Sequence, residues 1–257
     1  MTADKVKLRA NEIKPRLRKL RQDALRIEPR LVKRINEIGN ALLEHKNELL
    51  DQKQFLMEFL NEFYYDVEAY LHDVKPHLNL TDEEIQDFFE RSAISLTERY
   101  WYRVILPHWF SKEDSKLWIW MEKLLGGEQQ ASDQAFILSL DQALNARPDG
   151  CASHRYILDL SMATDLLASY VPCKLSPVFV QLKGIPVSRN NQRNPDFIDK
   201  QQKWFKTCSY WGIERALLIS HRAEVTCQDN LVSLADVILR ESRNSPDSFV
   251  STLSFPG

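Results

Sequence analysis

Three polar side chains in the C-terminal half of the chain could meet at one end of a β-hairpin. Gln181 and Lys183 lie near the end of an otherwise apolar segment, residues 177–183, which predicts a strand. Side chains alternate across a strand, so Gln181 and Lys183 share one face. The preceding apolar segment carries Asp165, and a hairpin turning around residues 172–175 would bring it beside them. A carboxylate, an amide oxygen and an ammonium group would then converge at the open end of the hairpin.

The charge around this hairpin bears on its interpretation. An ordinary ion pair between Asp165 and Lys183 on a surface hairpin would also account for the two charges. Seven cations nevertheless face only two acids in the surrounding sequence: Lys174, Lys183, Arg189, Arg193, Lys200, Lys203 and Lys206 against Asp196 and Asp199. Such a basic surface suits a phosphate backbone. The polar stretch 188–194 is interpreted either as a loop that contacts nucleic acid or as a plain solvated loop.

The elements that must position these residues make residues 128–257 an α/β domain. The apolar spacing from Phe136 to Leu144 predicts a helix. Strands are predicted over residues 155–160, 163–170, 177–183 and 213–220, and further helices over residues 196–211 and 231–242. The order is helix, three strands, helix, strand, helix, which is typical of an α/β unit.

The helix over residues 196–211 has two distinct faces. One face should pack on the sheet and carries Phe197, Gln201, Trp204, Phe205, Cys208 and Trp211. Lys200, Gln202 and Lys203 lie towards another face, which could line a substrate cleft.

Residues 1–127 are predicted to be all helical, because six of the seven glycines lie at or after Gly126. Over about residues 3–73, apolar residues recur mostly at alternating steps of three and four. This pattern predicts a long helix with a coiled-coil-like seam, which would form a helical arm or hairpin. Pro15 and Pro29 predict a break or kink near each of them.

Shorter helices are predicted to follow. The spacing of Thr81 and Glu84 is that of a capping box, which opens the first of them. Further helices are predicted over residues 97–105 and, capped by Ser111, over residues 112–125. The many aromatic residues of this region could form a core or a platform for base stacking, and helical spacing alone does not distinguish the two.

The charge of the helical region is polarised. Residues 1–36 carry twelve Lys/Arg and four Asp/Glu, a net charge of +8, whereas acids dominate residues 48–90. Three interpretations stay open: solvated faces of amphipathic helices, contact with nucleic acid, and binding of a protein partner.

The composition limits the classes of protein to which the chain can belong. The chain has 257 residues, 44% of them hydrophobic and 27% charged, as in ordinary globular proteins. No stretch approaches the roughly 18 apolar residues of a membrane helix, and residues 1–14 lack the apolar core of a signal peptide, so a cytoplasmic protein without membrane contact is expected. The four cysteines lie far apart, which argues against a zinc site or a redox pair. A net charge of −2 excludes a uniformly basic nucleic-acid coat.

The hairpin residues resemble a known superfamily. Asp165, then Gln181-x-Lys183 on an apolar strand, then a helix with Lys200, Lys203 and Lys206, are similar to the PD-(D/E)xK, or restriction-endonuclease-like, nucleases. The core of that superfamily has the order αβββαβ, and the resemblance covers roughly residues 130–242. The chain departs from the usual motif in two places: Thr164 stands where Pro is common, and Gln181 replaces the second acid, as active members also tolerate.

The resemblance implies a catalytic site at Asp165, Gln181 and Lys183. Asp165, the Gln181 side chain and the Leu182 backbone carbonyl would bind Mg²⁺, and Lys183 would orient the attacking water. A further acidic ligand often comes from the preceding helix. The candidates here are Asp141 first, then Asp159 and Glu122.

The implied function is a Mg²⁺-dependent endonuclease that hydrolyses DNA, of the type II restriction kind. Arg189, Arg193, Lys200 and Lys203 would contact the nucleic acid, and the helical region would form a homodimer or grip the substrate. Two alternatives stay open: a nuclease subunit of a larger defence or transposition complex, and a non-catalytic nucleic-acid-binding or scaffold protein with a degenerate nuclease fold.

Overall fold

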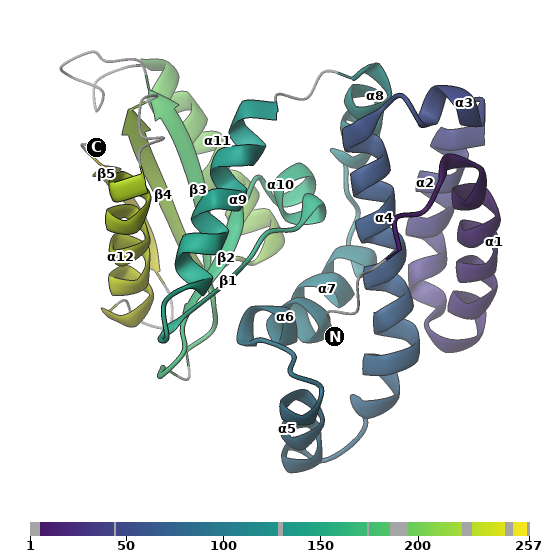
Figure 1. Cartoon of the computed structure of the whole chain (residues 1–257), viewed down its shortest axis with the longest axis horizontal. Coiled ribbons are helices and arrows are strands. Elements are labelled where there is room, and N and C mark those ends of the chain that lie inside the picture. The colour runs from purple at the N-terminus through teal and green to yellow at the C-terminus, as the bar shows by residue number, and fades with distance from the viewer. Residues whose placement is uncertain are drawn as a thin grey trace. The chain divides into compact units, whose positions relative to one another are not determined.

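The computed structural model divides the chain into two compact units, Met1–Gln129 and Gln130–Gly257 (Figure 1). It describes residues 6–43, 45–127, 131–173, 175–185, 195–222, 228–244 and 249–255. The division falls two residues after the boundary that the sequence predicts. None of the helices in these ranges is long and apolar enough to cross a membrane.

The first unit is entirely helical in the residues described. Its elements are α1 (Ala10–Ile27), η1 (Pro29–Leu31), α2 (Val32–Leu43), α3 (Asn47–Leu50), α4 (Gln54–Ala69), η2 (Tyr70–Val74), η3 (Lys75–His77), α5 (Asp82–Arg91), α6 (Leu96–Tyr100), η4 (Trp101–Ile105), α7 (Leu106–Ser111) and α8 (Leu117–Gly126). The helix α1 packs against both α2 and α4.

The described part of the range 3–73 is mainly helical, as expected of a helical arm or hairpin, but several helices that pack on one another occupy it in place of one long helix. A break at Pro29 is confirmed: Glu28 before it is not helical, with φ −146° and ψ 79°, because proline disfavours a helical conformation in the preceding residue. Pro15 causes no break and lies exposed in the second turn of α1. The apolar seam is buried, but it packs against helices of the same chain, so a coiled coil is not confirmed.

The capping box at Thr81 is confirmed, with the Thr81 hydroxyl and the Glu84 carboxylate each accepting from the other's backbone N–H. Ser111 does not cap the next helix but ends α7. The helix α8 begins only at Leu117, because the Asp114 carboxylate accepts hydrogen bonds from the N–H groups at its start. Most of the aromatic residues between positions 100 and 120 are buried in the core of the helical unit, although Trp118 is exposed.

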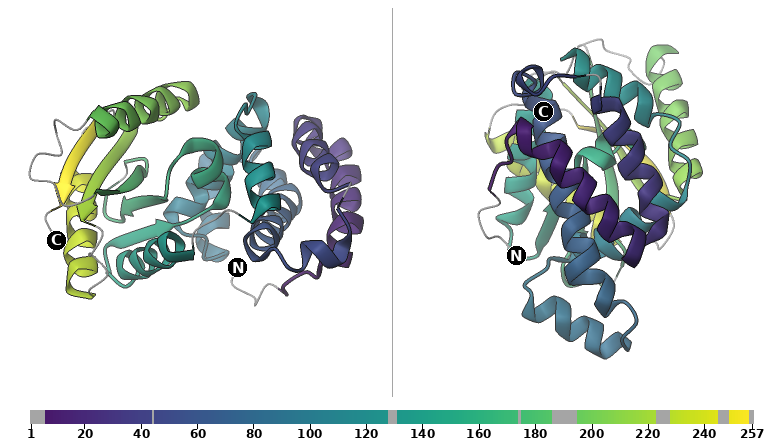
Figure 2. Two further views of the ribbon diagram at one scale, coloured as in Figure 1. Left: turned by 90° about the horizontal axis from the view of Figure 1, so that it is seen from above. Right: turned by 90° about the vertical axis from the view of Figure 1, so that its right-hand side faces the viewer.

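The second unit is built on a five-stranded mixed sheet with the strand order β1-β2-β3-β4-β5 (Figure 2). The strands are β1 (Gly150–Ser153), β2 (Leu166–Tyr170), β3 (Val178–Ile185), β4 (Arg215–Arg222) and β5 (Phe249–Phe255). The helices are α9 (Ala131–Asn145), α10 (Tyr156–Met162), α11 (Pro195–Trp211) and α12 (Gln228–Asn244). The strand β2 is antiparallel to both of its neighbours, β1 and β3, whereas β3, β4 and β5 run parallel to one another.

The predicted strand over residues 155–160 is wrong, because these residues belong to α10. The periodicity of apolar residues cannot distinguish a short buried strand from a buried helix of one or two turns. The first strand is instead β1, a four-residue segment with little apolar signal. The tail after α12 contains a further strand, β5, which the sequence did not predict.

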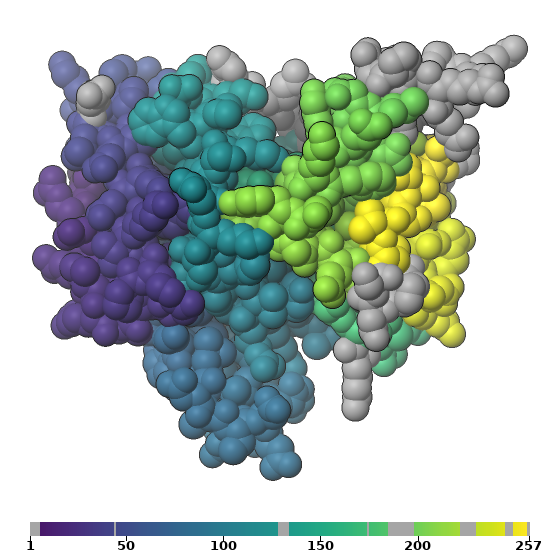
Figure 3. Space-filling view, turned by 180° about the vertical axis from the view of Figure 1, so that it is seen from behind, coloured from purple at the N-terminus to yellow at the C-terminus, as the bar shows by residue number. Residues whose placement is uncertain are grey.

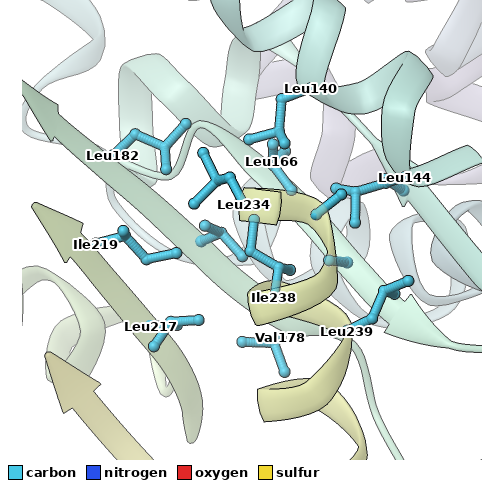
Figure 4. Close-up of a cluster of buried hydrophobic side chains, with 14 of the residues drawn as sticks. Leu140, Leu144, Leu166, Val178, Leu182, Leu217, Ile219, Leu234, Ile238 and Leu239 are labelled. Carbon is cyan, nitrogen blue, oxygen red and sulfur yellow. The ribbon is translucent and has the colours of Figure 1, made fainter. Parts of the chain in front are cut away.

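The two faces of the sheet are covered by different helices. Val178, Val180 and Leu182 of β3 point into an aliphatic cluster completed by α9 and α12 (Figure 4). The helix α11 covers the opposite face, where Trp204 and Trp211 donate to the carbonyls of Ala163 and Ser161. Its buried Trp204, Cys208 and Trp211 and exposed Lys200 and Lys203 confirm the two predicted faces.

A glycine is required where the chain leaves α9 for β1. A Cβ at Gly150 would collide with the backbone carbonyl oxygen of Leu144, so no larger residue fits without moving the backbone. This close approach lets β1 begin only a few residues after the helix ends.

We expect Ile238→Ala on α12 to lower the free energy of unfolding by about 2–5 kcal/mol, because Ile238 is fully buried in the aliphatic cluster. Val232→Ala on the same helix is the control, since Val232 is exposed and should change stability by less than about 0.5 kcal/mol. Urea denaturation followed by circular dichroism measures both. Equal effects would contradict the assignment of this face to the core.

Candidate functional site

Asp165 lies immediately before β2 and faces β3. Its backbone N–H donates to the carbonyl of Val180 at 2.9 Å, and the register pairs Leu166 with Val180. The antiparallel ladder therefore places Asp165 opposite Gln181. Both side chains are buried, with 6% and 2% of the residue exposed.

Gln181 and the Leu182 backbone surround the Asp165 carboxylate. Gln181 Nε2 donates to Asp165 Oδ2 at 2.6 Å, and the Leu182 N–H donates to the same oxygen at 2.5 Å. Gln181 Nε2 also donates to the Leu182 carbonyl oxygen at 3.2 Å. The structure thus brings together three of the residues that the sequence singled out.

The end of strand pairing explains why these contacts form. The strand β2 begins at Leu166, whereas β3 continues to Ile185. Val180 is the last residue of β3 to pair with β2, and the peptide groups of Leu182 point to the same side without a strand partner there. Asp165 accepts the Leu182 N–H and Gln181 donates to the Leu182 C=O, so side chains satisfy both backbone polar groups of this buried residue.

Lys183 shares the Gln181 face of β3 and is half-buried, opposite Ser220 of β4. Its ammonium favours the ionised form of Asp165 electrostatically. Between these two described residues there is no direct ion pair, so the interpretation of the hairpin as an ordinary salt bridge is wrong.

Burial, and after it the negative charge of Asp159, raise the pKa of Asp165 to about 7. The Leu182 N–H, the Lys183 ammonium and the Gln181 amide oppose this rise. Such a carboxyl group lowers the stability of the fold when it is ionised, and pKa values shifted this far are typical of functional sites.

The candidate acids differ in their relation to Asp165. Asp159, half-buried on α10, acts on the Asp165 charge, so it is nearer to the site than the sequence ranking suggested. Asp141 is half-buried on α9. Glu122 lies exposed on α8 of the helical unit.

His154 lies directly after β1. Burial and the neighbouring Arg155 guanidinium lower the pKa of His154 to about 4. Its ring packs edge-on against Tyr156. A histidine held neutral in this way is a structural residue rather than a proton carrier at neutral pH.

The basic residues are described only in part. Lys200, Lys203 and Lys206 are exposed on α11, which lies at the surface beside β5 (Figure 3). Lys203 forms an ion pair with Asp199 at 2.6 Å. Lys174, Arg189 and Arg193 lie outside the described residues.

A row of hydroxyl and amide groups on the same face of the sheet was not predicted. Ser220 Oγ lies 3.1 Å from Ser254 Oγ, and Gln201 Nε2 donates to Thr252 Oγ1 at 2.7 Å. The alternation of polar residues along β5 is a sequence signal that could have found Thr252 and Ser254.

The residues around Asp165 offer oxygen ligands of the kind that hard cations take. One carboxylate, one backbone carbonyl and one carboxamide fit Mg²⁺, which keeps several of its waters. Among the described residues no three of His, Cys, Asp and Glu cluster, so such a site would depend on the amide and the backbone oxygen. In those ranges Cys151, Cys173 and Cys208 form no disulfide.

Comparisons with protein-family models, with curated proteins and with solved structures found no match to this chain.

We expect Asp165→Asn to stabilise the protein at pH 8 and to do so much less at pH 4. In the unfolded chain Asp165 ionises near its ordinary pKa of 3.8, but in the folded protein near 7. The folded state therefore binds the proton more tightly, and stability falls as the pH rises between these values. The shift corresponds to about 2–4 kcal/mol at most.

Urea denaturation in EDTA at the two pH values tests this expectation. Asp199→Asn is the control, because Asp199 is exposed on α11. The stability of this variant should depend on pH in the same way as that of the wild type. An Asp165→Asn variant with the same pH dependence as the wild type would show that the carboxyl group titrates normally.

Proposed function

We propose that the chain is a metal-dependent endonuclease that hydrolyses DNA phosphodiester bonds, of the type II restriction kind. The observation that carries the proposal is the contact of the buried Asp165 carboxylate with Gln181 and the Leu182 backbone, one residue before Lys183 on the same strand. These are the positions at which the chain resembles the PD-(D/E)xK nucleases.

The order of elements supports the same class. With α10 left aside, α9, β1, β2, β3, α11 and β4 follow one another in the order αβββαβ. The pairing of β4 parallel to β3 after two antiparallel connections agrees with such a core. The α10 insertion lies between the first two strands and carries Asp159.

The chemistry follows from the groups that meet at β3. A bound Mg²⁺ would supply polarisation of the scissile phosphate and a more acidic water. Asp165 and the Leu182 carbonyl would hold the ion, and their burial keeps them in a fixed position. Lys183, half-buried on the same face, would orient the water and neutralise charge that develops on the phosphate.

DNA and a second copy of the chain are the proposed partners. The exposed lysines of α11 would contact phosphates, and two sites in a homodimer would cut both strands, with the helical unit as the dimer contact or the substrate grip. The exposed cations of α1, among them Arg18, Lys19 and Arg26, are compatible with either role of that unit.

Two alternatives rest on the same observations. A nuclease subunit of a larger defence or transposition complex would use the helical unit for docking and would not cut DNA alone. A non-catalytic DNA-binding or scaffold protein would keep Gln181 as a structural amide, because Gln181 already satisfies Asp165 and Leu182.

The proposal predicts that purified protein cuts plasmid DNA in Mg²⁺ and that Asp165→Ala or Lys183→Ala lowers the cleavage rate by about 100-fold or more. Lys123→Ala is the control, since Lys123 is exposed on α8 outside the candidate site. Discrete fragments from the wild type and the control alone would support a sequence-specific nuclease.

Other outcomes separate the alternatives. DNA binding without cleavage by the wild type, together with Mg²⁺ binding that Asp165→Ala abolishes, would favour a partner-dependent subunit. Mg²⁺ binding absent from the wild type would favour the scaffold and contradict the nuclease.

The proposed DNA surface is tested by salt dependence. Joint replacement Lys200→Ala and Lys203→Ala should weaken DNA binding and reduce the slope of log affinity against log salt by about two, one for each phosphate contact. The pair Arg18→Ala and Lys19→Ala, exposed on α1, tests the role of the helical unit: an unchanged slope would leave that unit as the dimer contact rather than the substrate grip. A loss confined to the α1 pair would move the nucleic-acid contact to the helical unit.

A further inference from the structure

The Gln181 amide nitrogen stands between the two oxygens that the proposed function assigns to the metal. Nε2 lies 2.6 Å from Asp165 Oδ2 and 3.2 Å from the Leu182 carbonyl oxygen and donates to both. Both hydrogens of the carboxamide are therefore used on these acceptors. In the metal-free protein the NH₂ group places partial positive charge between these two oxygens, as a bound cation would.

Chemistry fixes which end of the amide points at Asp165. A carboxamide turned by 180° would place Oε1 against the ionised Asp165 carboxylate and the Leu182 carbonyl oxygen, and neither of these acceptors could donate a hydrogen bond to it. Gln181 is only 2% exposed, so water cannot readily relieve such an arrangement. The orientation with the nitrogen towards Asp165 is the one that the metal-free site requires.

A cation at the same oxygens reverses this preference. The NH₂ group cannot ligate a cation, whereas Oε1 can. Gln181 would have to break its two hydrogen bonds and turn about its terminal carbon–carbon bond, so that Oε1 faces the ion.

We infer that Gln181 is a latch on the metal site: its NH₂ group holds Asp165 and the Leu182 carbonyl together without a metal, and it turns to present Oε1 when Mg²⁺ or Mn²⁺ binds. The inference rests on the proposed function, because it needs a cation at Asp165. Gln181 is here a positioning residue in one state and a ligand in the other. A glutamate in its place could serve only as a ligand.

The difference between glutamine and glutamate gives the first test. Gln181→Glu places a second carboxylate against Asp165 and leaves the Leu182 carbonyl without a donor, so the melting temperature in EDTA should fall by several degrees. The same change adds a negative ligand, so Mn²⁺ should bind about tenfold more tightly and raise the melting temperature more than in the wild type. Isothermal titration and thermal denaturation of the full chain measure both effects.

A matched control removes the general effect of a new charge. Gln201→Glu makes the same substitution at a half-buried amide of α11, which donates to Thr252 on the same face of the sheet. This variant should lose stability without gaining affinity for Mn²⁺. Equal gains in affinity from the two variants, or no gain from Gln181→Glu, would overturn the latch.

The Gln181 NH₂ group itself gives the second test. Its two amide-proton resonances, assigned by their loss in Gln181→Met, should exchange slowly with solvent in EDTA because both protons are hydrogen-bonded. Mg²⁺ should shift them and speed their exchange, together with shifts in the backbone signals of Asp165 and Leu182. This readout does not depend on cleavage.

The outcomes separate the latch from the function on which it rests. Backbone shifts at Asp165 and Leu182 with unchanged Gln181 NH₂ signals would overturn the latch and leave the metal-dependent nuclease intact. No response of any signal to millimolar Mg²⁺ would overturn the nuclease and the latch together, and would leave Gln181 as a permanent structural donor.

Discussion

The register of β2 on β3 is the constraint on which the candidate site depends. Leu166 pairs with Val180, both inside the aliphatic cluster, and this pairing alone puts Asp165 opposite Gln181. A slip of one residue would move Val180 out of the core and turn Gln181 into it. The hydrophobic face of the sheet thus determines, on its other face, which polar side chains meet.

The mismatch in length between the two strands adds the second condition. Because β3 continues beyond the start of β2, the backbone N–H and C=O of the buried Leu182 have no strand partner on the β2 side. Any sequence that folds this way must supply a donor and an acceptor there. Asp165 and Gln181 do so, and the same demand draws two polar side chains into a buried position where they can also bind a cation.

The sequence predicts this part of the molecule well, because its signals are local and strong. Strict alternation on β3 predicted the face of Gln181 and Lys183, and the spacing of the tryptophans predicted the buried face of α11.

The predictions that failed have physical reasons as well. Residues 155–160 contain only a short apolar run, so period alone could not distinguish helix from strand, and the four residues of β1 carry too little pattern. In the helical unit the apolar seam was correct, but a seam cannot tell whether its partner is another chain or the next helix of the same chain. The orientation of the Gln181 amide depends on contacts across the hairpin, which no spacing rule contains.

The state of Asp165 argues against a purely structural role for this cluster. Burial makes ionisation of the Asp165 carboxyl group unfavourable, which is why its pKa is about 7. Lys183 and the two hydrogen bonds favour the ionised form but do not offset this cost. If the only task were to satisfy the Leu182 N–H, a neutral amide or hydroxyl oxygen would accept the same bond without the electrostatic penalty. Asp159 makes the penalty larger, since it brings a second negative charge towards the first. A divalent cation beside the Asp165 carboxylate and the Leu182 carbonyl oxygen would offset this penalty, which is the physical reason for proposing that the site binds one.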